Sequence, residues 1–324
     1  MSLVNFSNLD FDQVKTSLRD YLKENSNFTD YDFEGSNLST ILDVLAYNTY
    51  ITSYNANMVA NEVFIDSATL RENVVALARN IGYLPRSRKA STATISFFVD
   101  TSNVSPTPST ITLKRGIVAT TTSSFAGQSF VFSIPEDKTV PITDGIAEFD
   151  QIEIYEGTFL TETYTINSSN QNQRIILSNP KIDTSVLNVL VRDTESDTTT
   201  QKYTLVEDLF DIDGTSKVFF IQEIEDQRYE LIFGDGVFGK KLNDLNYIEA
   251  SYLISNGPLA NNISEFSFSG RLFDNNGRIV TSEVSFIVTN SVSAKGQDIE
   301  DVNTVRKFAP RYYSTQNRAV TPTD

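Results

Sequence analysis

The stretch from about residue 87 to about residue 290 constrains the fold more than any other part of the chain. It is rich in Thr, Ser, Ile, Val and Phe, and turn-forming residues recur at short intervals. Such spacing is typical of antiparallel sandwiches and barrels, not of βαβ units. We therefore expect a β-rich body in two domains, residues 86–180 and 181–292, with strands near residues 92–99, 111–113, 117–122, 129–134, 146–155, 163–167, 174–177, 186–191, 201–206, 217–224, 227–233, 248–254, 263–268 and 283–289.

Helical patterns fill residues 1–85, which we predict to be a helical assembly domain. Apolar residues recur at helical spacing after Asp10, Ser36 and Asp66, and each of these three can cap a helix. Gly82 stands where a helix C-terminus favours glycine. The expected fold is therefore α+β: an N-terminal helical bundle, β-rich sandwich or barrel-like domains and a C-terminal helix.

The second helix carries an aromatic face in addition to its main apolar stripe. Tyr47, Tyr50, Ile51 and Tyr54 lie off the stripe that contains Leu42. A helix with two apolar faces packs against two neighbours, and the second neighbour is either another part of the same bundle or another chain. Both interpretations stay open at this point, and the four residues are our candidates for a partner interface.

Residues 293–324 predict one more helix followed by a linker. Asp298 can cap a helix over residues 299–309, which Pro310 is expected to end. The final residues, Thr321 to Asp324, form a helix-start signal with Pro322 at the first helical position. We expect the natural chain to continue into further C-terminal domains.

Composition excludes several kinds of function. The 324 residues contain neither Cys nor His, which removes thiol nucleophiles, Ser-His-Asp arrangements and thiolate or imidazole metal sites. The net charge of −16 disfavours binding to nucleic acid and to anionic membranes. No apolar run reaches the ~20 residues that span a bilayer. An acidic surface suits assembly with basic partner surfaces.

The motif around Gly234, Asp235 and Gly236 is the most distinctive local feature. A strand-like segment precedes it, and two glycines around an aspartate allow a tight reversal of the backbone. Its spacing matches no phosphate-binding loop, and no helical pattern follows it. We interpret it as a structural turn.

Other polar clusters favour structural roles. Asp211 and Asp213 lack the spacing of an EF-hand loop, and an acidic turn is the better interpretation. Arg86, Arg88 and Lys89 are too few for a nucleic-acid site. We predict no catalytic residue, no metal site and no cofactor.

Four stretches in order carry a family resemblance: residues 28–50 (FTDYDFEGSNLSTILDVLAYNTY), 68–87 (ATLRENVVALARNIGYLPRS), 233–242 (FGDGVFGKKL) and 293–324. The last two resemble the baseplate J-like family of contractile-tail phages. The first two narrow the resemblance to the N-terminal part of the large baseplate wedge proteins of T-even-like phages. Residues between about 90 and 225 are not distinctive.

The resemblance implies a structural, non-enzymatic protein of the virion, assembled in the host cytoplasm into the tail baseplate. Its expected partners are a second copy of itself, other wedge proteins and the region of the tail hub. In that family the wedges form a ring around the hub, which couples receptor engagement to sheath contraction. Two alternatives stay open: a tail-associated glycan-binding or glycan-degrading protein, and a scaffold that leaves the particle.

Overall fold

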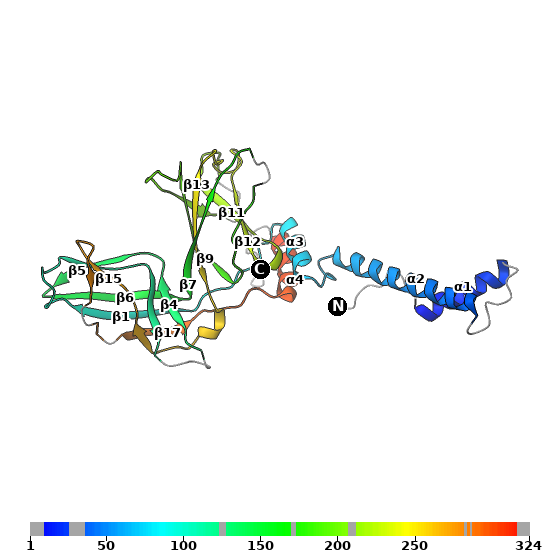
Figure 1. The fold of residues 1–324 in the computed structure, drawn as a ribbon, viewed down its shortest axis with the longest axis horizontal. Coiled ribbons are helices and arrows are strands. Elements are labelled where there is room, and N and C mark those ends of the chain that lie inside the picture. The colour runs from blue at the N-terminus through cyan, green and yellow to red at the C-terminus, as the bar shows by residue number, and fades with distance from the viewer. Residues whose placement is uncertain are drawn as a thin grey trace. The chain divides into compact units, whose positions relative to one another are not determined.

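The structure is a computed structural model that describes residues 10–25, 36–122, 128–169, 173–206, 212–281, 284–285 and 287–315. It separates into two compact units. One contains residues 1–84 and 301–324, and the other contains residues 85–300. Helices make up the first unit and two β-sheets make up the second, so the predicted α+β class is confirmed (Figure 1). The predicted boundaries at residues 85, 180 and 292 stay predictions.

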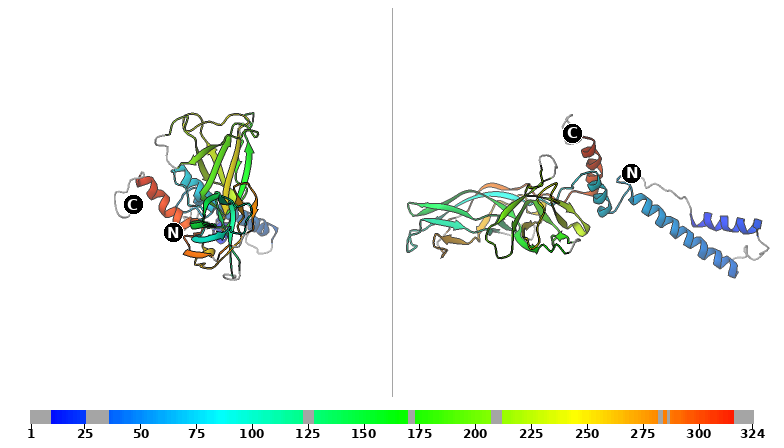
Figure 2. Two further views of the ribbon diagram at one scale, coloured as in Figure 1. Left: turned by 90° about the vertical axis from the view of Figure 1, so that its left-hand side faces the viewer. Right: turned by 90° about the horizontal axis from the view of Figure 1, so that it is seen from above.

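The first two helices begin where the sequence places their caps. α1 (Phe11–Asn25) follows Asp10, whose carboxylate accepts a hydrogen bond from the Phe11 N–H. α2 (Asn37–Glu62) follows Ser36, whose hydroxyl accepts from the Ser39 N–H at 3.0 Å. α1 lies alongside one end of α2, as two views show (Figures 1 and 2).

α3 (Arg71–Asn80) and α4 (Val302–Thr315) pack through small side chains. Ala78 and Ala309 are fully buried in this contact, and the Tyr83 and Tyr312 rings meet edge to face. The prediction that Pro310 ends the last helix is wrong, because α4 continues through it to Thr315. Packing on α3 therefore outweighs the hydrogen bond that proline cannot donate.

Ten strands form the larger sheet, and its inward faces enclose one apolar core. Inward residues alternate with outward ones along β1. The Phe97 ring stacks on the Phe149 ring with 4.9 Å between the ring centroids. The centroid of the tilted Phe268 ring lies 5.0 Å from that of Phe97. The ten strands are β1 (Thr92–Asp100), β2 (Thr110–Leu113), β3 (Gly116–Thr121), β4 (Val131–Ile134), β5 (Lys138–Thr143), β6 (Ile146–Glu156), β14 (Phe266–Phe268), β15 (Leu272–Asp274), β16 (Ile279–Val280) and β17 (Val288–Ala294).

The second sheet has seven strands in the order β7-β13-β9-β10-β11-β12-β8. All its strand pairs are antiparallel except β10 with β11, which are parallel. This parallel pair differs from the antiparallel pairing that we expected from the sequence. The strands are β7 (Thr158–Thr165), β8 (Ile175–Ile176), β9 (Ile182–Arg192), β10 (Gln201–Leu205), β11 (Val218–Glu223), β12 (Tyr229–Phe233) and β13 (Tyr247–Ile254).

Side chains, not a backbone ladder, join the two end strands of this sheet. The Glu162 carboxylate on β7 accepts hydrogen bonds from the Ser178 N–H, just after β8, and from the Tyr164 and Tyr252 hydroxyls. The Tyr164 hydroxyl oxygen also lies 2.7 Å from the carbonyl oxygen of Ile176 on β8. These bonds give the sheet a barrel-like closure.

The β unit begins and ends at adjacent positions. Lys89 and Gln297 exchange two backbone hydrogen bonds, of 2.9 and 3.0 Å. The Glu300 N–H donates to the Arg86 carbonyl, and the Glu300 carboxylate accepts from the Arg86 N–H. The first and last strands, β1 and β17, then pair antiparallel. The chain therefore enters and leaves the unit through one cross-linked stem.

Candidate assembly interface

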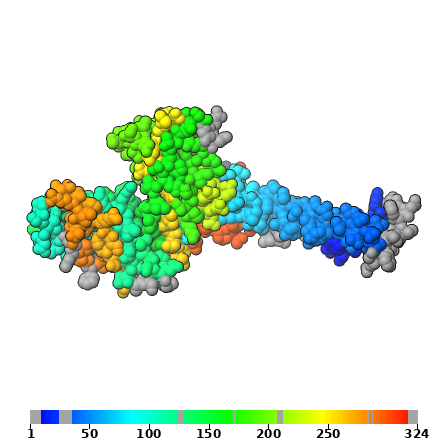
Figure 3. Space-filling view, in the orientation of Figure 1, coloured from blue at the N-terminus to red at the C-terminus, as the bar shows by residue number. Residues whose placement is uncertain are grey.

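The surface of α2 is the best candidate for a functional site in the described part of the chain. Of its 26 residues only Ser39, Leu42, Ala46 and Asn61 are buried. In Figure 3, no other described part of the chain covers the visible side of the light-blue part of α2. The large apolar side chains exposed on α2 and just after it are Ile41, Val44, Leu45, Tyr47, Tyr54, Met58, Val59, Val63 and Phe64.

Five of the apolar residues on α2 form a continuous line, the α2 stripe: Val44, Tyr47, Ile51, Tyr54 and Met58. Their spacing alternates between three and four residues, which is the a/d pattern of helices that pack in coiled coils. The helix contains just two charged residues, Asp43 and Glu62. Charge depletion with aromatic enrichment characterises the centre of protein interfaces.

The four residues singled out from the sequence differ in exposure. Tyr47 is 60% exposed and Tyr54 is 54% exposed, whereas Tyr50 and Ile51 are half-buried. Their role as a partner interface stays a prediction. Sequence reasoning missed Val44 and Met58, although the three-four spacing and the lack of charge were signals that could have found them.

A carboxylate at the end of α2 caps the next helix. The N-terminus of α3 lies at Leu70, which has no polar side chain of its own. The Glu62 carboxylate accepts hydrogen bonds from the Thr69 N–H and the Asn73 amide, both at 2.8 Å, and from the Leu70 N–H. Glu62 therefore supplies the cap that the sequence analysis assigned to Asp66, and that assignment is wrong.

Glu62 makes the α2–α3 connection sensitive to acid. Partial burial raises the pKa of its carboxyl, but the hydrogen bonds from Thr69, Asn73 and Leu70 outweigh burial and lower the pKa to about 2. A carboxyl with a depressed pKa stabilises the fold above its unfolded value of 4.5, and this stabilisation is lost as pH falls from there toward 2.

We expect Glu62→Gln to unfold at lower urea concentration than the wild type at pH 7, and the gap to shrink below pH 4. The helical signal in circular dichroism, followed in urea titrations at both pH values, measures the gap. Glu72→Gln, an exchange in the first turn of α3 itself, is the control for loss of one negative charge. An equal gap at both pH values would contradict the cap.

The turn at Gly234, Asp235 and Gly236 is tightly hydrogen-bonded. The Asp235 carboxylate accepts from the Val237 and Phe238 N–H groups at 2.8 and 2.9 Å, and these bonds lower the pKa of Asp235. The Gly236 N–H donates to the Gly239 carbonyl at 3.0 Å. The Asp235 carboxylate is thus used within the turn.

A second loop locks the turn in place. The Gly239 N–H donates to the Asp213 carbonyl, and the Lys240 N–H donates to the Ser216 carbonyl. Hydrogen bonds from Ser216 and Thr215 lower the pKa of the Asp213 carboxyl to about 2. Asp211, the other aspartate in the calcium-loop alternative, lies outside the described residues.

The remaining polar clusters show no ligand chemistry. Arg88 forms an ion pair with Asp298 at 3.0 Å, and Arg86 belongs to the cross-linked stem. Within the described ranges, no three acidic residues gather as a metal site would require. No described helix is long and apolar enough to cross a membrane.

Comparisons with known proteins match the two units separately. Residues 10–83 match the helical domain of the gp6-like baseplate wedge proteins, and residues 162–264 match the third domain of bacteriophage baseplate wedge protein gp6. The chain is 25% identical over 334 residues to baseplate wedge protein gp6 of Enterobacteria phage T4. That alignment covers 97% of this chain and 48% of the T4 protein, so the chain spans about half the length of this relative.

A solved structure, the six-fold symmetrised cryo-EM structure of the anti-feeding prophage baseplate, also aligns with the chain. It covers 98% of this chain and 63% of the other chain at 12% identity, with a TM-score of 0.30. A TM-score this low carries no argument about the arrangement of the fold.

A charge-poor apolar helix surface and a β-rich body fit the class of structural assembly proteins. The matches to two gp6 domains in chain order make the class specific. The chain belongs to the gp6-like, baseplate J-like family of phage baseplate wedge proteins. It is therefore a structural component of the tail baseplate in the virion, and the prediction that it is not an enzyme is confirmed.

Proposed function

We propose that α2 joins two copies of this chain and neighbouring wedge proteins into the ring around the tail hub that couples receptor engagement to sheath contraction. The observation that carries the proposal is the α2 stripe. A long helix in water depends on tertiary packing for most of its stability. α1 supplies such packing on one side of α2, and the stripe leaves room for a partner on another.

Helix pairing is the form of contact that the stripe favours. A three-four repeat of apolar residues fits the corresponding repeat of a second helix. A symmetric contact between two copies needs a self-complementary surface, and a nearly uncharged stripe meets its own copy without repulsion between like charges. Other wedge proteins then occupy further surfaces of the same helix, where Ile41, Leu45, Val59 and Val63 are exposed.

The copy number of the protein in the particle tests the ring. Quantitative mass spectrometry of purified virions should give a fixed multiple of six copies per tail, and twelve if each of six wedges holds two. A count that is not a multiple of six would contradict the ring. A count of six would retain the ring and reject the paired copies.

A further inference from the structure

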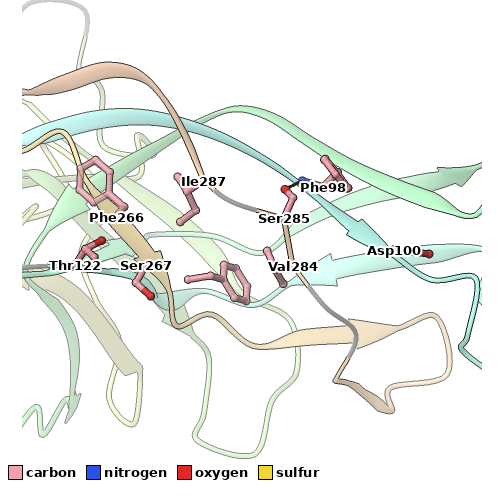
Figure 4. A pocket seen from close by; sticks show the side chains of 9 residues that line it. Phe98, Asp100, Thr122, Phe266, Ser267, Val284, Ser285 and Ile287 are labelled. Atoms are coloured by element: carbon pink, nitrogen blue, oxygen red, sulfur yellow. Dashed lines mark hydrogen bonds between the residues drawn. The ribbon is translucent and has the colours of Figure 1, made fainter.

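The larger sheet of the β unit is left open between two of its strands. β14 is an edge strand in the described part of the sheet, paired with β3 on one side. Across from it lie Val284, Ser285 and Ile287, which precede β17 in the chain. A groove of about 720 Å³ separates them, lined by Phe266, Ser267 and Phe268 on one side and by Val284, Ser285 and Ile287 on the other (Figure 4).

The backbone of β14 directs the N–H and C=O groups of Phe266 and Phe268 away from β3, on the side of the groove. The Thr122 N–H donates to the Glu265 carbonyl, and the Ser269 N–H donates to the Val118 carbonyl. An antiparallel ladder alternates, so residues 265, 267 and 269 face β3 while Phe266 and Phe268 direct their N–H and C=O groups away from it. Such an edge is a template for pairing with another strand.

The two sides of the groove are joined at one end and diverge from there. The Thr289 hydroxyl donates to the Ser264 carbonyl at 2.6 Å, and the Ser293 N–H donates to the Ile263 carbonyl at 2.9 Å. Farther from this end, Ser285 bonds to β1 on the other side: its N–H donates to the Phe98 carbonyl at 3.0 Å. The sheet is therefore closed at Ser264 and open at Phe268.

The lining favours a peptide over a charged small ligand. Among the described residues that line the groove, Asp100 is the one ionisable side chain, and its carboxylate accepts a hydrogen bond from the Ser102 N–H at 2.9 Å. Phe268 and Ile287 pack against the core beneath the groove. An extended peptide satisfies both features, because its backbone pairs with the edge while alternate side chains face the core.

We propose that the groove accepts an extended segment of a neighbouring baseplate protein, which adds as a strand beside β14. Its core-facing positions carry apolar residues. Its solvent-facing positions carry Lys or Arg, because Asp100 lies at the groove and the chain has a net charge of −16. This strand site is distinct from the helix contact of α2, and either can exist without the other.

Residue-resolved hydrogen exchange tests strand addition. In the free full chain, the amides of Ser267 and Ser269 should exchange slowly and those of Phe266 and Phe268 fast. In purified baseplates, the Phe266 and Phe268 amides should exchange at least 10-fold more slowly than in the free chain. Unchanged exchange at Phe266 and Phe268 in baseplates would overturn the proposal, because a strand must bond these groups.

A blocking experiment separates strand addition from mere covering of the groove. The chain has no cysteine, so a single thiol can be labelled. Ser267→Cys, coupled to a bulky maleimide, should lower incorporation into baseplates at least 10-fold. The matched control is labelled Ser196→Cys, at an exposed loop position in the other sheet region, which should incorporate normally. Normal incorporation of the labelled Ser267→Cys protein would overturn the proposal.

Discussion

Replacing Tyr47 and Tyr54 together with glutamate is expected to weaken self-association of the chain at least about 100-fold. Both side chains are more than half exposed, so the substitutions leave the fold of one copy intact. In a paired helix contact each carboxylate would be buried without a partner, and truncating a single hot-spot residue alone costs about 2 kcal/mol or more. Sedimentation equilibrium measures the dissociation constant directly.

A matched control comes from the same helix. Thr49→Glu with Ala56→Glu adds the same two charges at the same seven-residue spacing, and both positions are exposed. Each lies two residues after its tyrosine, which is about 200° around the helix. The control should self-associate like the wild type. A tyrosine double variant that does the same would contradict the proposed role of the α2 stripe.

Gly234→Ala is expected to destabilise the β unit by about 3 kcal/mol. A Cβ atom at Gly234 would lie 2.2 Å from the backbone carbonyl carbon and oxygen of Gly239. Backbone atoms cannot rotate away as a side chain can, so the turn and the Asp213 loop that holds it must both move. Overpacking of this kind costs up to about 3 kcal/mol and occasionally more.

Gly236→Ala in the same turn provides the comparison. Gly236 has a φ of +97°, but a Cβ there meets only the Lys241 Cβ at 3.8 Å. The expected cost is therefore the conformational one alone, about 1–2 kcal/mol. Urea unfolding followed by tyrosine fluorescence suits a chain with 14 Tyr and no Trp. Equal midpoints for the two variants would refute the close approach of Gly234 to Gly239.

Local sequence patterns correctly predicted helix ends where a capping residue or a C-terminal glycine marked them. Asp10 and Ser36 cap their helices as expected, and Gly82, just beyond α3, has the positive φ of a helix C-terminus. Strand β5 was missed because it contains Pro141, which argues against a strand by its lack of an N–H group. Pairing with β2 outweighs this local penalty.

The candidate interface could be predicted only in part. The aromatic residues Tyr47 and Tyr54 stood out by type, but the sequence could not show which face α1 covers. The cap at α3 was assigned to Asp66 because an N-cap residue normally lies directly before the helix that it caps. Glu62 lies eight residues before Leu70, and only the turn between the helices brings its carboxylate to the N–H groups.

The cross-linked stem of the β unit has a mechanical consequence. A pulling force that reaches the chain at both ends of the β unit acts first on the hydrogen bonds of the stem. These are the two bonds between Arg86 and Glu300 and the backbone pair of Lys89 and Gln297. β1 and β17, which follow, are antiparallel neighbours in one sheet. The load passes across the stem from one chain end to the other, and the sheets beyond it stay unstressed. We therefore expect the β-rich body to keep its shape under a pull that the hydrogen bonds of the stem can bear.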